Sequence, residues 1–174
     1  SVPGLARSDE ALAHIDAFYA EFDQIKAQGL DELIISGAKV TNPSLDLEPF
    51  WGPLKDVIEW AADNVTSILC SCLATHALVK HLYGIDRRPL PQKLWGVYRH
   101  RVCDRMHPLT QDVNTRFDAP HSRWNDIPRE EWDGHGLRVL AESEVAGVHL
   151  ATSADGFRIV YFQGHPEYDR NSLL

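Results

Sequence analysis

The sequence predicts an α/β fold of three layers, in which helices cover both faces of a mainly parallel sheet. Short runs with strand composition, such as Leu33–Ile35 and Val65–Ser71, are typical of strands buried on both faces. Between such runs lie segments whose apolar residues recur at three- and four-residue steps, as in amphipathic helices. Three later strand-like runs, separated by the turn signals EVAG and ADG, predict antiparallel additions near the C-terminal end.

The first half of the chain supplies two helices and the first buried strand. Ser8 precedes acidic residues and an amphipathic pattern, which together predict a helix that continues to Gly29. The apolar run Leu33–Ile35 then predicts a short strand that ends in a Ser-Gly turn. A polar loop follows, and the apolar spacing over 50–64 predicts the second helix.

The second half alternates strand and helix before its pattern becomes irregular. Residues 65–71 predict a second buried strand, and residues 73–83 predict a helix that ends at Gly84. A third strand is expected over 94–102, after a proline-rich connection. Residues 103–132 show no clear period, and an irregular region of that length in a compact domain is usually functional or disordered.

The bulk composition describes a single domain with an acidic surface. A chain of 174 residues suffices for one buried core, and we expect one domain over residues 1–174. The formal charge of −8, without a basic stripe, argues against nucleic acid or an anionic membrane as a partner. No apolar run approaches the ~20 residues of a membrane span, and the first residues lack a signal-peptide core. Three cysteines fit a reducing compartment, so we expect a cytoplasmic protein.

Ligands of such folds bind beyond the carboxyl ends of the strands. Three predicted strand ends meet there, at Gly37, at Cys72 and at Gly164. Gly37 suits a close approach of the backbone and can supply an amide to an oxyanion hole. A plain strand-ending turn explains Gly37 equally well.

Cys72 stands between a predicted buried strand and a predicted helix. A thiol at that turn faces the amides of a helix N-terminus, which favour a thiolate and can hold an oxyanion. A buried packing cysteine explains the position equally well. Cys70 belongs to the strand itself, where alternate residues face opposite sides, and we expect it to pack in the core.

The segment GHPEYD offers a base and a group to orient that base. His165 follows a predicted strand end, and Glu167 lies two residues later, where its carboxylate can fix the imidazole tautomer. The tripeptide His-Pro-Glu alone is a weak signal. Its place at one strand end, with Cys72 at another, indicates a Cys-His-Glu site.

Two sets of thiol and imidazole groups occur within short spans. They are Cys70, Cys72 and His76, and His100, Cys103 and His107. Neither set has the paired C-x2-C spacing of a structural zinc site, so no metal is expected. Surface or satisfied core positions explain these histidines.

Three further polar residues are candidates for substrate contacts. Lys93 can hold a carboxylate or a phosphate, although a lone lysine is usually a solvated charge. Ser122 and Arg123 form a polar pair in the irregular region, where turn capping is the simpler explanation.

Six motifs occur in order over residues 31–169: SGA, LCSCLATHALVKHLYGI, GVYRHRV, APHSRW, LAES and GHPEYD. Together they resemble the homoserine O-acyltransferase family of methionine biosynthesis, the homoserine transsuccinylases. The combination of APHSR with GHPEYD is rather specific to that family. The resemblance implies a flavodoxin-like fold similar to the class I glutamine amidotransferases. It also implies that the family's first strand and C-terminal helix lie outside residues 1–174.

The same resemblance implies roles for residues at the strand ends. Cys72 would be the nucleophile, His165 the general base and Glu167 the partner of that base. Backbone amides of three residues would hold the oxyanion: Gly37, Ala38 and Leu73.

Substrate contacts are implied at four positions, Thr41, Lys93, Ser122 and Arg123. Thr41 occupies the place where a small residue in the family admits a succinyl chain and a glutamate favours acetyl. Because Thr41 carries no negative charge, the resemblance favours succinyl.

The implied reaction is a ping-pong transfer. The Cys72 thiolate attacks the thioester of succinyl-coenzyme A, and free coenzyme A departs. His165 then deprotonates the hydroxyl of L-homoserine, which attacks the acyl-cysteine. Acyl-coenzyme A is a co-substrate, no bound cofactor is expected, and the family implies a homodimer.

Three alternatives differ in donor, reaction or class. The first is an acetyl-coenzyme A-dependent acetyltransferase acting on homoserine or serine. The second is a glutamine amidohydrolase, although those enzymes usually carry glycine on each side of the elbow cysteine, where this chain has Ser71 and Leu73. The third is an inactive binding domain, against which the intact set of Cys72, His165 and Glu167 argues.

Overall fold

The computed structural model describes residues 7–38, 40, 42–169 and 171–173, and the chain separates into two compact units. The first unit comprises residues 1–33 and 40–66, and the second comprises residues 34–39 and 67–174. Both catalytic motifs predicted from the sequence, around Cys72 and around His165, belong to the second unit. None of the helices in the described residues combines the length and the apolar character that a membrane crossing requires.

The first unit is helical. It contains α1 (Asp9–Phe18), α2 (Phe22–Gln28), a short 3-10 helix η1 (Leu45–Leu47) and α3 (Trp51–Asn64). The single helix expected between Ser8 and Gly29 is broken, because Tyr19 and Glu21 adopt extended backbone. Neither α1 nor α2 buries a residue, so core packing, which supplies most helix stability in proteins, does not hold them as one helix.

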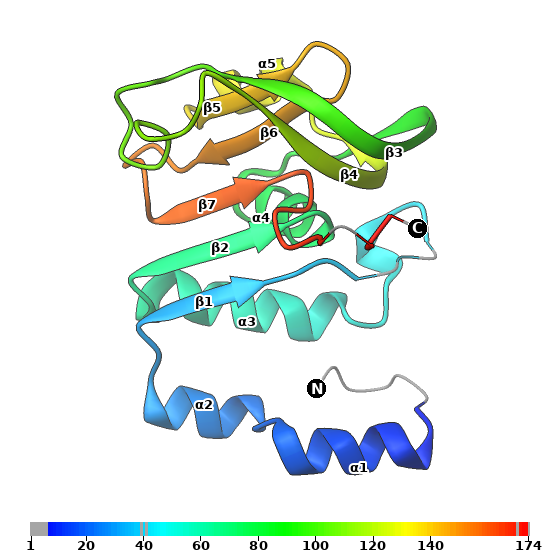
Figure 1. Ribbon diagram of the computed structural model, residues 1–174. Coiled ribbons are helices and arrows are strands. Elements are labelled where there is room, and N and C mark those ends of the chain that lie inside the picture. Colours follow the sequence, from blue (N-terminus) through cyan, green and yellow to red (C-terminus); the bar gives the residue numbers. More distant parts are fainter. Residues whose placement is uncertain (1–6, 39, 41, 170, 174) are drawn as a thin grey trace. The chain divides into compact units, whose positions relative to one another are not determined.

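A seven-stranded sheet runs through the second unit in the order β1-β2-β7-β6-β5-β3-β4 (Figure 1). The strands are β1 (Glu32–Ile35), β2 (Ser67–Ser71), β3 (Arg88–Val102), β4 (Arg116–Asp126), β5 (Arg138–Ser143), β6 (Gly147–Thr152) and β7 (Ile159–Phe162). Two helices belong to this unit, α4 (Leu73–Tyr83) and α5 (Arg129–Gly134). The first two residues of β1 fall in the first unit and the last two in the second.

The predicted α/β class and its antiparallel additions are confirmed, and the antiparallel part is larger than expected. β2 pairs with β7 in parallel, whereas β7, β6, β5, β3 and β4 follow one another in antiparallel pairs. The strand expected over 94–102 is the second half of β3, and it pairs antiparallel with β4 and β5. Residues 103–132, expected to be irregular, contain β4 and the first part of α5.

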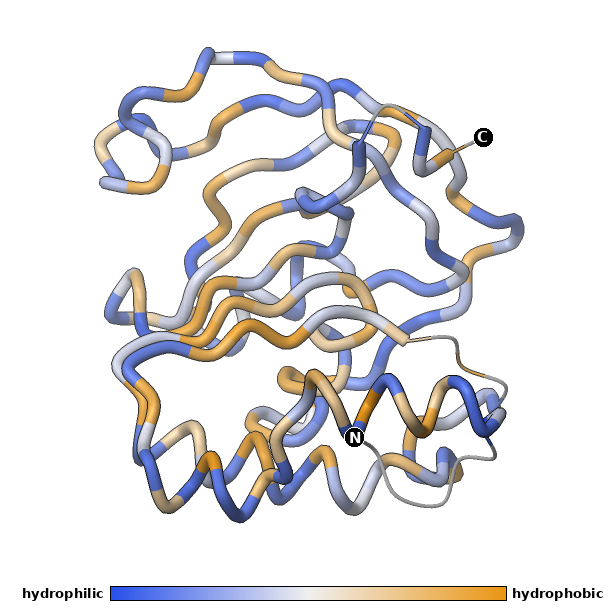
Figure 2. Tube along the Cα trace, turned by 60° about the horizontal axis from the view of Figure 1, so that its bottom comes forward, coloured by the Kyte–Doolittle hydropathy of each residue, from blue (hydrophilic) through white to orange (hydrophobic). Residues whose placement is uncertain are grey.

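The hydrophobic core follows the central strands and the helix after β2. Figure 2 shows hydrophobic residues concentrated along these strands. Residues 73–79 of α4 are all buried, and Ile68 of β2 is fully buried as well. Trp132 of α5 packs edge-on against Tyr161 of β7, with ring centroids 5.6 Å apart. This core fixes the ends of β2 and β7 side by side, where the two candidate catalytic segments begin.

Candidate active site

Cys72 occupies a sharp turn between β2 and α4. Its φ of 52° and ψ of −116° make it the one non-glycine residue with positive φ in the part of the chain that the structure describes. Such a backbone costs on the order of 1–3 kcal/mol and persists only where its surroundings enforce it. The Cys72 amide donates to the carbonyl oxygen of Phe162 at 2.8 Å, and the Thr75 hydroxyl donates to the same oxygen at 2.7 Å. The end of β7 therefore holds the strained turn in place.

Gly37 lies directly against this turn. A Cβ atom at Gly37 would lie 3.2 Å from the Cys72 Cβ, 3.5 Å from the Leu73 nitrogen and 3.7 Å from the Cys72 Sγ. Leu73 is the first residue of α4, so its amide has no partner within the helix. The Leu73 amide and the Gly37 backbone thus lie beside the sulfur, where an oxyanion hole is needed. Ala38 follows Gly37 and is exposed.

His165 and Glu167 form the pair that the sequence predicts. The His165 Nδ1 lies 2.9 Å from the Glu167 Oε1, and the Ser71 hydroxyl donates to the same carboxylate oxygen at 3.3 Å. The Tyr168 ring stacks on the imidazole with ring centroids 4.0 Å apart. The other ring nitrogen of His165, Nε2, is buried and has no hydrogen-bond partner of regular geometry among the described residues. Glu167 therefore orients the ring and leaves Nε2 available to donate or accept a proton.

The electrostatic surroundings favour a protonated His165. Burial of the ring lowers the pKa, but the hydrogen bonds and charges of Cys72 and Glu167 outweigh it and raise the pKa of His165 to about 9. Cys72 is thus one of the two residues that raise the pKa of the His165 imidazole. A protonated His165 suits a site in which the Cys72 sulfur acts as the nucleophile.

Cys70, two residues before the elbow, is a packing residue as expected. It is fully buried, and its thiol donates to the Val160 carbonyl oxygen at 3.4 Å. Burial raises the pKa of Cys70 to about 12, although its contact with the Thr75 hydroxyl works in the other direction. A thiol in this state is a poor nucleophile.

The segment that carries His165 is held by β4 and β6. The His165 amide donates to the carbonyl oxygen of Pro120 at 2.9 Å. The preceding Gly164 has no room for a side chain, because a Cβ there would lie 2.7 Å from the His149 Nδ1 and 2.8 Å from the Pro120 oxygen. Glycine is therefore required at position 164 for the close approach of these segments.

The structure brings the expected substrate-contact segments of β3 and β4 together. Ser122 is the register partner of Trp95, and Leu94, next to Lys93, is the register partner of Arg123. The Lys93 ammonium lies 3.7 Å from the centroid of the Trp95 ring, a cation–π contact. Thr41, the fourth expected contact, lies outside the described residues.

Arg123 is buried and is largely used by the protein itself. Its guanidinium donates to the carbonyl oxygens of Asn125 and Ala146, to the Asp126 carboxylate and to the His121 ring. Four of the five N–H groups of the guanidinium are therefore engaged, since arginine has five donors. Burial lowers the pKa of Arg123, and the Asp126 carboxylate opposes that change. The guanidinium thus ties β4 to the turn between β5 and β6.

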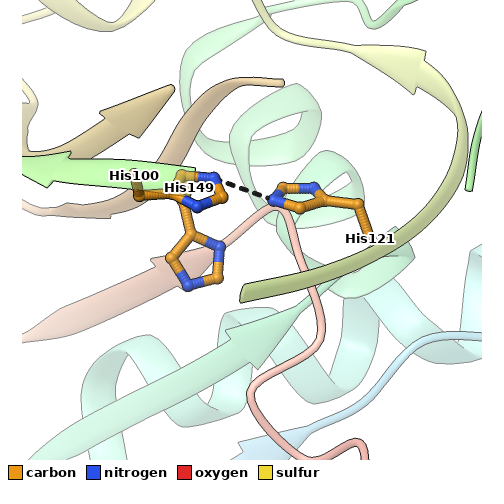
Figure 3. A group of neighbouring side chains, drawn as sticks. All are labelled: His100, His121 and His149. Atoms are coloured by element: carbon orange, nitrogen blue, oxygen red, sulfur yellow. Dashed lines mark hydrogen bonds between the residues drawn. The ribbon is translucent and has the colours of Figure 1, made fainter. Parts of the chain in front are cut away.

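Sequence reasoning missed a cluster of three buried histidines beside the site, His100, His121 and His149 (Figure 3). They come from β3, β4 and β6, and one nitrogen of each lies within 4.8 Å of the others. Alternation along β3 and β4 would have placed His100 and His121 inward, had β4 been recognised as a strand. Neither of the two sets of thiols and imidazoles noted in the sequence forms such a group within the described parts of the chain.

The hydrogen bonds around His121 do not fit a metal site, although the spacing of the three rings does. A histidine that binds a metal through one nitrogen normally donates a hydrogen bond from the other. The His121 Nδ1 instead accepts a hydrogen bond from the Arg123 Nε at 3.3 Å. A dication would also lie beside the buried guanidinium of Arg123, whose charge lowers the pKa of all three rings in addition to burial.

Comparison with known proteins identifies relatives over the full length of this chain. The family model described as homoserine O-succinyltransferase matches residues 2–174. A homoserine O-succinyltransferase of Methylobacter tundripaludum is 62% identical over 100% of this chain and 49% of its own length. One of Allochromatium vinosum is 64% identical over 98% of this chain and 48% of its own length. The chain thus spans about half the length of the curated relatives it matches.

Solved structures with low sequence identity share the fold. The glutaminase domain of Trypanosoma brucei CTPS superposes with a TM-score of 0.63 and 11% identity, covering 84% of this chain and 68% of its own. A glutamine amidotransferase of Thermotoga maritima gives a TM-score of 0.61 and 16% identity, covering 90% and 68%. These likenesses confirm the predicted glutamine amidotransferase-like fold. The family match over residues 2–174, together with the curated relatives, shows that this chain belongs to the homoserine O-succinyltransferase family.

Proposed function

We propose that the protein transfers a succinyl group from succinyl-coenzyme A to the hydroxyl of L-homoserine through a thioester on Cys72. The observation that carries this proposal is the arrangement of Cys72, on a strained turn, beside a His165 ring that Glu167 orients. The names of the relatives support succinyl as the acyl group and homoserine as the acceptor.

In the first half-reaction the Cys72 thiolate attacks the thioester carbonyl of the donor. The new carbon–sulfur bond places negative charge on the carbonyl oxygen, which the Leu73 amide and the Gly37 backbone are positioned to stabilise. The bond to coenzyme A then breaks, and the leaving thiolate takes a proton from the His165 imidazolium. His165 is left neutral, and Cys72 carries the succinyl group.

The second half-reaction uses that neutral imidazole as a base. Once Cys72 is acylated it carries no negative charge, so its contribution to the raised pKa of His165 disappears. His165 then accepts the hydroxyl proton of homoserine, and the hydroxyl oxygen attacks the thioester. Release of O-succinylhomoserine restores the thiolate and the imidazolium. One residue thus serves as acid and then as base because acylation changes its electrostatic surroundings.

Intact-protein mass spectrometry tests the proposal. After brief exposure to succinyl-coenzyme A, we expect one succinyl adduct on Cys72 that disappears when homoserine is added. Acetyl-coenzyme A and glutamine serve as competing donors, and a Cys72→Ala variant is the control. An adduct on Cys70 would refute the assignment of the nucleophile. Absence of an adduct from either acyl donor would refute acyl transfer, and an adduct from glutamine would indicate an amidohydrolase.

Further assignments extend this proposal. Lys93 and Ser122 are proposed substrate contacts, which the pairing of β3 with β4 supports. The remaining N–H of Arg123 is the part of its guanidinium proposed to reach substrate. The donor-selecting role of Thr41 rests on sequence alone. A cytoplasmic homodimer is proposed, three free cysteines support the reducing compartment, and light scattering tests the dimer.

A further inference from the structure

A continuous chain of hydrogen bonds runs through two of the buried histidines. The Arg123 Nε donates to the His121 Nδ1 at 3.3 Å, and the His121 Nε2 lies 3.1 Å from the His100 Nε2. The His100 Nδ1 lies 2.8 Å from the carbonyl oxygen of Tyr98. Figure 3 shows the two rings with the bond between them. The exposed fractions of His100 and His121 are 1% and 0%, so these hydrogen bonds are shielded from bulk solvent.

The two ends of the chain fix where every proton lies. Arg123 is only a donor, so the His121 Nδ1 must be unprotonated. A carbonyl oxygen is only an acceptor, so the His100 Nδ1 must carry a proton that it donates to Tyr98. With both rings neutral, the His121 Nε2 holds the single proton between the rings and donates it to the His100 Nε2. The direction runs without ambiguity from Arg123 to Tyr98, and every polar atom of both rings is satisfied.

Protonation of either ring would break the chain. A proton on the His121 Nδ1 would face the Arg123 N–H, and a proton on the His100 Nε2 would face that of His121. Burial, then the charge of Arg123, lowers the pKa of His121 to about 2. His149 of β6 packs against both rings, with centroids 4.8 Å from His100 and 5.3 Å from His121, but it takes no part in the chain.

The series of hydrogen bonds from Arg123 to Tyr98 adjoins the segment that carries His165, the proposed base. His121 follows Pro120, whose carbonyl oxygen accepts the His165 amide hydrogen bond. On the other side, Arg123 lies within electrostatic range of Cys72 and holds Ala146 at the β5–β6 turn. The residues between these anchors are therefore fixed by His121, which has protein partners at both ring nitrogens.

We propose that His121 is a positioning residue of the active site: its hydrogen bonds to Arg123 and His100 lock the Pro120–Arg123 segment, and thereby the His165 backbone, in register with Cys72. The inference rests on the proposed acyl transfer, but its first test does not. His121 acts here through Pro120 and Arg123 and has no contact with the reacting atoms in this proposal.

The first experiment measures tautomers in the wild-type protein by nitrogen-15 NMR of the histidine rings. We expect His121 as the neutral Nε2–H form and His100 as the neutral Nδ1–H form at pH 7. A His121 ring protonated at Nδ1 would overturn the proposal. So would zinc that remains bound after dialysis and shifts the Nε2 resonances of both rings.

The second experiment compares two variants of one position. His121→Gln retains an amide N–H where the Nε2 donates, whereas His121→Leu has similar bulk and no donor or acceptor. We expect the Leu variant to lose about tenfold to a hundredfold in the rate of Cys72 succinylation, the effect expected of a misplaced catalytic group. The Gln variant should recover most of that loss. Arg99→Gln changes an exposed residue of β3 that pairs with Asp118 of β4 and leaves the hydrogen-bonded histidines untouched, and its rate should stay within about twofold of wild type.

A third readout separates this inference from the proposed function. Loss of the His165–Cys72 alignment should raise the pH at which iodoacetamide alkylates Cys72 in His121→Leu, and His121→Gln should reverse that rise. If the wild type forms no succinyl adduct but shows these tautomers and this shift, acyl transfer fails while the positioning role stands. A folded Leu variant with wild-type alkylation at every pH, or a Gln variant as impaired as Leu, would overturn the positioning role.

Discussion

Lowering the pH from 7.5 to 5.5 is expected to reduce the free energy of unfolding of the second unit by about 3 kcal/mol. The reason is that His76, His121 and His149 are buried and stay unprotonated in the folded state. Burial first, and then neighbouring positive charge, lowers the pKa of His76 to about 3, of His121 to about 2 and of His149 to about 3. Each ring titrates near 6.5 in the unfolded chain. Their stabilising contribution is therefore present above pH 6.5 and is lost as the pH falls, by roughly 1.4 kcal/mol per ring at pH 5.5.

His165 changes stability in the opposite direction. Its pKa in the folded protein is raised to about 9, so its contribution is full below pH 6.5 and is lost as the pH rises through 9. Between pH 7.5 and 5.5, protonation of His165 stabilises the folded state by roughly 1 kcal/mol. This gain offsets part of the roughly 4 kcal/mol that is lost at His76, His121 and His149. Burial also lowers the pKa of His100, which adds to the loss. Carboxylates with ordinary pKa values stay ionised across this window.

Urea unfolding followed by tryptophan fluorescence measures the effect, since the chain has five tryptophans and Trp132 is fully buried. The free energy of unfolding should be lower at pH 5.5 than at pH 7.5 by about 3 kcal/mol, with the same urea dependence. His149→Leu removes one titrating ring and should reduce that difference by about 1.4 kcal/mol. Equal stability at the two pH values would show that these rings are protonated or hydrated in the folded state, and would refute the reasoning.

Three substitutions test the geometry of the site. The free energy of unfolding of Cys72→Gly should be about 1 kcal/mol higher than that of Cys72→Ala, because glycine tolerates the positive φ at this position. Equal stability of the two variants would show that the backbone at Cys72 is not strained. Gly164→Ala should lower the free energy of unfolding by about 1–3 kcal/mol, because its Cβ would lie 2.7 Å from the His149 Nδ1, and wild-type stability would show that the loop yields freely. Glu167→Gln should lower the pKa of His165 from about 9, measured by NMR titration, and an unchanged value would remove Glu167 from the pair.

The positions of the candidate catalytic residues could be predicted because they lie where a local pattern changes. Cys72 follows an apolar strand and precedes an amphipathic helix, and His165 follows another strand end, so rules for strand ends suffice to bring them together. The strain at Cys72 and the orientation of His165 by Glu167 required the structure.

β4 could not be recognised from periodicity, and the histidine cluster was missed with it. The inward positions of β4 hold Ala119, His121 and Arg123, and the two polar ones are buried because hydrogen bonds satisfy them. A hydrophobic alternation therefore does not appear in the sequence. Partners from β3 and from the turn after β5 supply those hydrogen bonds, and no local rule predicts which distant strand will do so.

The parallel pairing of β2 with β7 also determines when the site can form as a chain emerges from the ribosome. Ser71 beside Cys72 and Glu167 beside His165 are 96 residues apart, although their side chains share a hydrogen bond. Closing a loop of that size is entropically unfavourable, and contacts between distant segments slow folding. The elbow at Cys72 has no β7 carbonyl to hold it until Phe162 has been synthesised. Until β7 has been made, a growing chain therefore carries a thiol whose turn is not held in place, and it gains the oriented histidine only when the segment of His165 and Glu167 docks.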